Sequence, residues 1–234
     1  NKVKNLVFIT SDKCYLNINT RNPYKETDYL GGHDIYSSSK AAAEILFHSF
    51  HDSFFKKINN KLKKVTARAG NVIGGGDFKI NRIVPDFFKS TYKKKKLIIR
   101  SPEATRPWQH VLEPLSGYLV LGEKILNDKL SSNLYPSWNF GPYYKNCRRV
   151  VEVIDEFYKE LRLKKNYIIK KNYNLKEAQL LSLNINKAKK ELNWSPKLSL
   201  KECIEFTTDW YINYFSGNSV KNITEEQIET YENK

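Results

Sequence analysis

Several features are absent or scarce in this sequence of 234 residues. It has no methionine and only three cysteines, Cys14, Cys147 and Cys203, which are scattered along the chain. Their odd number and their spacing fit neither a metal site nor a disulfide framework, so we expect no metal and a reduced, cytoplasmic protein. No apolar run approaches the roughly 20 residues of a membrane span, and no signal-peptide pattern appears, so we expect no membrane attachment.

Acidic residues are also scarce, because 25 Asp and Glu face 40 Lys and Arg and give a net charge of +15. The lysines cluster at 56–64, 93–96 and 164–171. No DNA- or RNA-binding motif accompanies these clusters, so we interpret them as solvated faces and expect no nucleic-acid partner. A positive field that attracts a small anionic substrate is the functional alternative.

The first part of the chain follows a strand, helix, strand order. Residues 5–10 (NLVFIT) form an apolar run typical of a parallel strand, and residues 16–33 are a loop rich in polar residues. A helix then begins after the cap Asp34, and residues 65–69 form the next strand. We expect the buried stripe of that helix to consist of Ala41, Ile45, Leu46 and Phe50. This order predicts a parallel βαβ unit.

Beyond residue 80 the pattern is mixed. Short strands are predicted at 97–100 and 138–140. Helices are predicted at 83–92, 115–126, 150–161, 185–193 and 200–215.

Polar residues follow both strands of the predicted βαβ unit. Ser11 and Asp12 follow the first strand, and Gly70 and Asn71 follow the second. Ligands of open α/β sheets bind outside these carboxyl ends, so the sequence predicts a site there.

Tyr36 and Lys40 lie four residues apart, so they share one face of the predicted helix. A nearby ammonium favours phenolate over phenol, and such a tyrosine can take the proton of a hydroxyl group. Ser11, at the neighbouring strand end, could hydrogen-bond the same hydroxyl. A surface Tyr–Lys pair is common by chance, but the serine upstream favours a catalytic group.

Together, Ser11 and the stretch YSSSK at 36–40 resemble the active site of extended short-chain dehydrogenases that act on nucleotide sugars. The stretches ARAGNVIGGGD (67–77), RSPEATRPWQHVLEPLSGYL (100–119) and WNFGP (138–142) are similar to the CDP-glucose 4,6-dehydratases among them. The resemblance implies a Rossmann-like doubly wound parallel sheet with a smaller mixed α/β substrate-binding region. It assigns residues 1–80 to the NAD-binding domain, and residues 81–234 to the nucleotide-sugar region, with some segments returning to the sheet.

The resemblance also implies a reaction: NAD-dependent oxidation of CDP-glucose at C4, loss of water across C5 and C6, and return of the hydride to C6. It makes Tyr36 the base at C4, and Lys40 a further ligand of the nicotinamide ribose. Ser11 would bind the C4 oxygen, and Asp12 would protonate the departing C6 hydroxyl. Lys13 stands where the related dTDP-glucose enzymes carry a glutamate base. It would either accept the C5 proton or stabilise the enolate.

By the same resemblance, Arg106 would pair with the substrate diphosphate and Asn71 would contact the sugar-diphosphate. Arg82 and Asn139 are further candidates for substrate binding. Trp108 and His110 are interpreted as packing residues. The family commonly pairs the helix that carries the tyrosine with its symmetry mate, so we expect a homodimer of the full-length protein.

No GxxGxxG motif occurs in the chain, although the family begins with a strand, a glycine-rich turn and a helix that bind the NAD pyrophosphate. We therefore expect a C-terminal portion of a dehydratase that lacks the first βαβ units. Alone, it would be unstable, inactive and poor at binding NAD. Two alternatives stay open: an epimerase or reductase on the same scaffold, and a non-catalytic protein that binds nucleotide sugars or nucleic acid.

Overall fold

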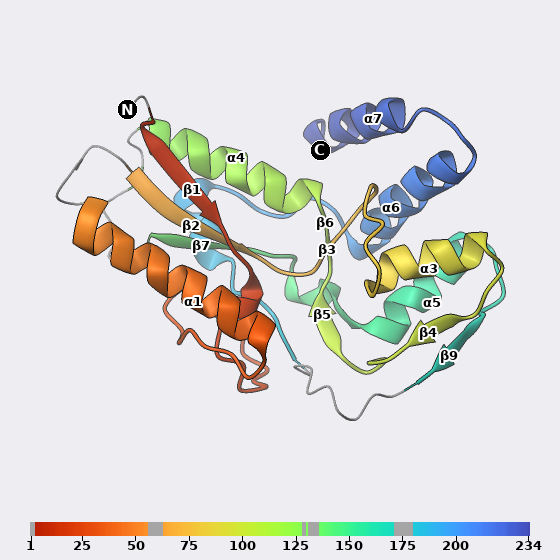
Figure 1. Ribbon diagram of the computed structural model, residues 1–234. Helices are drawn as coiled ribbons and strands as arrows, with labels where there is room; N and C mark the ends of the chain where they lie inside the picture. Colours follow the sequence, from red (N-terminus) through yellow and green to blue (C-terminus); the bar gives the residue numbers. More distant parts are fainter. Residues whose placement is uncertain (1–2, 56–62, 128–129, 131–135, 171–179) are drawn as a thin grey trace. The chain divides into compact units, whose positions relative to one another are not determined.

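Parallel strands and covering helices dominate the computed structural model, which describes residues 3–55, 63–127, 130, 136–170 and 180–234. The chain packs as two units, each drawn from three separate stretches of sequence (Figure 1). Unit 1 comprises residues 1–70, 113–144 and 180–196, and unit 2 comprises residues 71–112, 145–179 and 197–234. The two units are defined by packing, so the division of function near residue 80 stays a prediction.

Unit 1 is built on a parallel sheet with the strand order β1–β2–β7. Its strands are β1 (Asn5–Ile9), β2 (Lys63–Ala69) and β7 (Ser137–Phe140). Helix α1 (Ile35–Phe50) and the turn η2 (His51–Phe55) lie between β1 and β2 in the chain, so the predicted parallel βαβ order is confirmed. Figure 1 shows α1 and α4 (Leu112–Leu126) on opposite sides of this sheet. The short 3-10 helix η1 (Asp12–Cys14) and the short π-helix η4 (Ala188–Leu192), which lies within the helix predicted at 185–193, also belong to the unit.

The two faces of this sheet differ in chemistry. Val65 and Ala67 of β2 pack with Leu121 and Ile125 of α4 in an apolar core. The alternate residues of the same strand, Thr66 and Arg68, point toward α1 because successive side chains of a strand face opposite ways. The helix that carries the candidate tyrosine therefore covers a polar face.

The predicted apolar stripe of α1 is wrong apart from Ala41. Ile45, Leu46 and Phe50 are exposed, whereas the buried positions are Ser37, Ala41, Glu44 and Phe47. The helix is turned in this way because Phe47 stacks on Phe8 of β1 at 5.1 Å between ring centres, and because Glu44 pairs with Arg68. Asp34 caps the helix as predicted.

Strand β1 is parallel, as predicted, but it is not fully buried. Among the described residues it pairs only with β2. In this chain the side chains of Leu6 and Ile9 are exposed.

Unit 2 joins short strands to four helices among the residues described there. The strands are β3 (Val72–Ile73), β4 (Leu97–Ile99), β5 (Thr105–Pro107), β6 (Gln109–His110), β8 (Cys147–Arg149) and β9 (Tyr167–Ile169). The helices are α3 (Ile83–Tyr92), α5 (Val150–Glu160), α6 (Leu200–Phe215) and α7 (Val220–Glu232), and the turn η3 (Tyr144–Asn146) precedes β8. Helix α7 was not among the predicted elements.

Aromatic side chains fill the core of unit 2. Phe88 of α3 stacks on Tyr211 of α6 at 4.2 Å, and Phe87 packs against Phe157 of α5 at 5.3 Å between ring centres. Trp108 and His110 are each 2% exposed, which confirms their interpretation as packing residues.

The lysine clusters mostly lie on the surface. The side chains of Lys93 to Lys96 are exposed, as are Lys164, Lys165 and Lys170, which confirms the predicted solvated faces there. Lys64 is an exception, because it is buried in β2 and burial lowers its pKa. Residues 56–62 and 171 of the clusters lie outside the described residues. No helix of the described chain combines the length and the apolar character needed to cross a membrane.

Two glycines of α4 allow a paired test of packing. A Cβ atom added to Gly117 would lie 2.2 Å from the Phe140 ring, which is fully buried and held edge-on by Trp194 at 5.0 Å. A Cβ atom added to Gly122 would meet nothing within 4 Å. We expect Gly117→Ala to lower the free energy of unfolding by about 1–3 kcal/mol, because the ring cannot retreat. Gly122→Ala should raise it by up to about 1 kcal/mol, because alanine favours helix.

Urea unfolding of the intact protein and both variants measures the two effects. An equal stability of Gly117→Ala and the unmodified protein would contradict the packing of α4 on Phe140.

Candidate active site

The turn that follows β1 carries Ser11, Asp12 and Lys13. Ser11 caps η1: its Oγ accepts a hydrogen bond from the Lys13 amide at 3.2 Å and donates one to Asp12 Oδ1 at 3.0 Å. Asp12 is 2% exposed, whereas Ser11 and Lys13 are half-buried. A hydroxyl, a carboxyl and an ammonium group therefore follow one another at the carboxyl end of β1, where the sequence predicted a site.

Helix α1 packs against this turn and carries Tyr36 and Lys40 in its first two turns. The Lys40 ammonium lies 5.5 Å from the centre of the Tyr36 ring, so the two side chains share one face, as their spacing predicted. Tyr36 is 56% exposed and can be reached by a ligand.

The N-terminal cap of α1 also interacts electrostatically with the turn that carries Lys13. Asp34 accepts hydrogen bonds from the amides of Tyr36 and Ser37 and from the Ser37 hydroxyl. Hydrogen bonds from Ser37 lower the pKa of Asp34 most, and the charge of Lys13 contributes. The charge of Lys13 thus favours the ionised form of Asp34.

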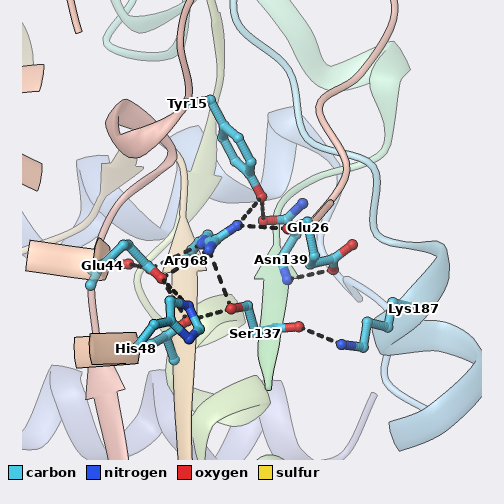
Figure 2. A network of polar contacts seen from close by, with 10 residues as sticks. Tyr15, Glu26, Glu44, His48, Arg68, Ser137, Asn139 and Lys187 are labelled. Atoms are coloured by element: carbon cyan, nitrogen blue, oxygen red, sulfur yellow. Dashed lines mark hydrogen bonds and ion pairs between the residues drawn. The ribbon is translucent and has the colours of Figure 1, made fainter. Parts of the chain in front are cut away.

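A buried ion pair lies beneath these residues. Glu44 of α1 and Arg68 of β2 are almost fully buried and form two parallel hydrogen bonds, Nε to Oε1 at 2.9 Å and Nη2 to Oε2 at 2.8 Å. Thr10, Thr66 and His48 also contact the Glu44 carboxylate (Figure 2). Strands β1 and β2 are thus joined to α1 through one carboxylate.

The network continues to Tyr15 and Asn139 (Figure 2). Arg68 Nη1 donates to the Tyr15 hydroxyl at 2.9 Å, and that hydroxyl donates to Asn139 Oδ1 at 2.7 Å. The Asn139 amide donates to the backbone oxygens of Tyr24 and Asn184. Asn139 is fully buried, and its side-chain donors and acceptor are all used. This arrangement favours a structural role for Asn139 over the substrate contact predicted from the sequence.

The other candidate substrate ligands belong to unit 2. Arg106 of β5 is 5% exposed, and its Nη1 donates to the Thr105 backbone oxygen at 3.0 Å. Arg82 is exposed and forms an ion pair with Asp77 at 2.9 Å. Asn71 is half-buried before β3, where its backbone oxygen accepts a hydrogen bond from the Gln109 amide. Among the described residues, no group of three or more His, Cys, Asp or Glu side chains could hold a metal ion.

A family model described as GDP-mannose 4,6 dehydratase matches residues 1–207 of the chain. The match covers unit 1, unit 2 as far as residue 207, and every candidate residue of the site. The chain belongs to this family. The resemblance to nucleotide-sugar dehydratases predicted from the sequence is thereby confirmed.

A curated member, the CDP-glucose 4,6-dehydratase of Salmonella typhimurium, is 35% identical over 232 residues, which cover 98% of this chain and 64% of the relative. Two solved structures have similar folds. The dTDP-glucose 4,6-dehydratase of Bacillus anthracis in complex with NAD has a TM-score of 0.75 and 22% identity, covering 89% of this chain and 62% of its own. The UDP-glucuronic acid 4-epimerase of Bacillus cereus, in complex with UDP-glucuronic acid and NAD, has a TM-score of 0.76 and 18% identity. The match covers 92% of this chain and 63% of the epimerase chain.

The chain thus spans a little under two thirds of the length of these relatives. The similar folds confirm the predicted Rossmann-like α/β class. The solved proteins with this fold include a dehydratase and an epimerase, so the fold alone does not select between these activities.

The family pattern pointed to Ser11, Asp12, Tyr36 and Lys40, but the Glu44–Arg68 pair was not predicted. Two sequence features could have indicated it. Glu44 lies one turn beyond Lys40, in register with Ser37 and Ala41 on the sheet side of α1. Arg68 lies between Ala67 and Ala69, at the apolar end of the strand. Opposite charges at two inward positions of neighbouring elements indicate a buried ion pair.

The Glu44–Arg68 pair predicts a loss of stability in acid. Burial by itself would raise the pKa of Glu44, but hydrogen bonds from His48 and Arg68, the Arg68 charge and the Thr10 hydroxyl outweigh it and bring the pKa to about 2. Because the folded pKa lies below the ordinary value of 4.5, the stabilisation is complete above that value and is lost as the pH falls toward 2. We expect the free energy of unfolding to fall between about pH 5 and pH 2.

The variant Glu44→Gln isolates this contribution, because it removes the titrating group and keeps the shape of the side chain. Its stability should depend less steeply on pH over the same range. Glu26, whose pKa is raised chiefly by burial, titrates in both proteins and cancels in the comparison. Parallel pH profiles from urea unfolding would show that Glu44 is not the group concerned.

Proposed function

We propose that the protein is an NAD-dependent nucleotide-sugar 4,6-dehydratase that converts CDP-glucose to CDP-4-keto-6-deoxyglucose. The observation that carries the proposal is the packing of the Ser11–Asp12–Lys13 turn against the helix that bears Tyr36 and Lys40. Identity of 35% to a CDP-glucose 4,6-dehydratase across 98% of the chain supports the choice of substrate.

In this proposal, Tyr36 and Ser11 act on the C4 hydroxyl of the glucosyl unit. Ser11 Oγ donates a hydrogen bond to the C4 oxygen. The phenolate oxygen of Tyr36 accepts the proton of the C4 hydroxyl. Lys40 stabilises the phenolate, since its ammonium lies over the same helix face at 5.5 Å from the ring centre. The exposure of Tyr36 is consistent with direct contact to substrate.

The same face of α1 suits NAD. Lys40 offers a cation with three hydrogen-bond donors, and Tyr36 offers a hydroxyl, which together fit the two hydroxyl groups of a nicotinamide ribose. When bound, NAD supplies the oxidant for C4 and the reductant for C6.

In this proposal, residues of the turn after β1 carry out the elimination of water across C5 and C6. Asp12 protonates the departing C6 hydroxyl. Lys13 accepts the C5 proton, or stabilises the enolate that its loss creates. Arg106, Asn71 and Arg82 are the proposed ligands of the diphosphate and sugar, because guanidinium and amide groups match phosphate and hydroxyl oxygens.

The protein is further proposed to act as a homodimer in the cytoplasm. Helix α1 exposes Ile35, Ile45, Leu46 and Phe50, an apolar face that a second copy of α1 would cover. The three cysteines are all free, as suits a reduced compartment.

Substrate conversion by the full-length protein tests the activity, because we expect the present chain alone to be inactive. We expect CDP-glucose with NAD to lose one water by mass, and dTDP-glucose to be converted far more slowly. Asp12→Asn should lower product formation by about 100-fold or more, because a general acid supplies roughly that factor. The variant should still oxidise C4, which the absorbance of reduced nicotinamide records.

Asp52→Asn serves as the control, since Asp52 is an exposed carboxylate of η2 in the same unit. A product of unchanged mass and inverted C4 would replace the dehydratase proposal with an epimerase. Salt-sensitive DNA binding without any conversion would point to a nucleic-acid binding protein.

Light scattering tests the dimer. Leu46→Glu places a charge on the exposed face of α1 and should halve the measured mass. The control Leu126→Glu changes an equally exposed leucine at the end of α4, on the other side of the sheet, and should leave the mass unchanged. A monomeric unmodified protein would contradict this part of the proposal.

A further inference from the structure

The Glu44–Arg68 pair is placed to do more than join a helix to a sheet. All five N–H groups of the Arg68 guanidinium are used. Nε and Nη2 bind Glu44, Nη2 also donates to Ser137 Oγ at 3.2 Å, and Nη1 donates to the Tyr15 hydroxyl and the Glu26 backbone oxygen. A guanidinium held in every direction cannot rotate or slide without breaking hydrogen bonds.

Two of the partners of this pair bracket the turn that carries Ser11, Asp12 and Lys13. Thr10, immediately before Ser11, donates its hydroxyl hydrogen bond to Glu44 Oε1. Tyr15, which ends η1, accepts the hydrogen bond from Arg68 at 2.9 Å. The turn is therefore held, at the residues directly before and after it, by the two members of one ion pair.

The same ion pair also holds the helix of Tyr36. Glu44 lies one turn beyond Lys40 and two turns beyond Tyr36 along α1. Figure 2 shows the Glu44 carboxylate directed at Arg68 from the α1 side. A displacement of Glu44 would carry Lys40 and Tyr36 with it, because a helix moves as a rigid body over two turns.

An apolar contact would attach α1 to the sheet without fixing its register. Burying two charges costs about as much as their attraction returns, so such a pair adds little net stability compared with hydrophobic residues of the same volume. The directional hydrogen bonds of the ion pair, however, fix both the position of α1 along the sheet and its rotation about its own axis. Displacement of a reacting group by about 1 Å can cost on the order of 100-fold in rate.

We propose that Glu44 and Arg68 are positioning residues that clamp both ends of the 11–14 turn and fix it against the helix of Tyr36 and Lys40. This inference rests on the proposed dehydratase for the meaning of the site, but the clamp itself is a property of unit 1. Its test therefore needs one measurement that does not depend on activity.

Thr10→Val is the variant of choice, because it removes one hydrogen bond of the clamp, keeps the side-chain shape and leaves no charge unpaired. Thr10→Ser retains the hydroxyl and is the conservative control. Gly117→Ala is the control for destabilisation, since it disturbs the opposite face of the same sheet and none of the clamp.

Amide hydrogen exchange of the intact protein is the first readout. The amides of Lys13, Cys14 and Tyr15 are hydrogen-bonded within the turn, to Ser11 Oγ, the Ser11 backbone oxygen and the Asp12 backbone oxygen. We expect Thr10→Val to speed their exchange at least tenfold, and Thr10→Ser and Gly117→Ala to leave it near that of the unmodified protein. Unchanged exchange in Thr10→Val would overturn the clamp, whatever the activity of the protein.

Steady-state kinetics with CDP-glucose and NAD is the second readout. We expect Thr10→Val to lower kcat by about 10- to 100-fold with KM changed less than about threefold, and Thr10→Ser to restore kcat. A purely structural role would leave kcat per folded molecule unchanged, as in Gly117→Ala, and this result would overturn positioning. If the unmodified full-length protein fails to convert CDP-glucose, the proposed function falls, while hydrogen exchange still decides the clamp.

Discussion

The buried ion pair between Glu44 and Arg68 is the constraint on which the arrangement of unit 1 depends. Two charges inside a protein are tolerated only when their hydrogen-bonding groups are satisfied, and here the arginine uses all five donors. Satisfying them requires β2, β7, α1 and Thr10, the residue after β1, to meet at one point. The polar face of the sheet, the rotation of α1 and the path of the chain after β1 all follow from this requirement.

Helix α1 shows how one element meets three demands. Its N-terminal turns present Tyr36 and Lys40, its sheet side buries Glu44 and Phe47, and its outer side exposes Ile45 and other apolar residues. A sequence whose apolar residues face outward and whose carboxylate faces inward is unfavourable for an isolated amphipathic helix. The helix adopts this rotation because Arg68 and Phe8 offer partners to the inward residues.

Sequence patterns predicted the parallel βαβ unit, the cap at Asp34 and the common face of Tyr36 and Lys40, since local spacing determines each of them. The sequence patterns were insufficient where contacts between residues far apart in the sequence determine the structure. The predicted buried face of α1 was wrong because the ion pair of Glu44 with Arg68 stabilises the observed rotation more than burial of Ile45 and Leu46 would stabilise the predicted one. For Asn139, one of the weaker candidate ligands, nothing in the sequence indicated that Tyr15 and two backbone oxygens bind its amide. Helix α7, with few apolar residues, gave a weak periodic signal.

The residues that the clamp uses to hold the turn differ from the residues proposed to act on substrate. The clamp holds the turn through Thr10 and Tyr15, which lie outside the three residues proposed to act on substrate. The side chains at positions 12 and 13 can therefore differ without loss of the anchoring contacts. Lys13 is one of these central side chains, and it lies within the turn that Thr10 and Tyr15 anchor. A scaffold that fixes the ends of a short turn allows its central side chains to change, and so permits different elimination or epimerisation chemistry on one fold.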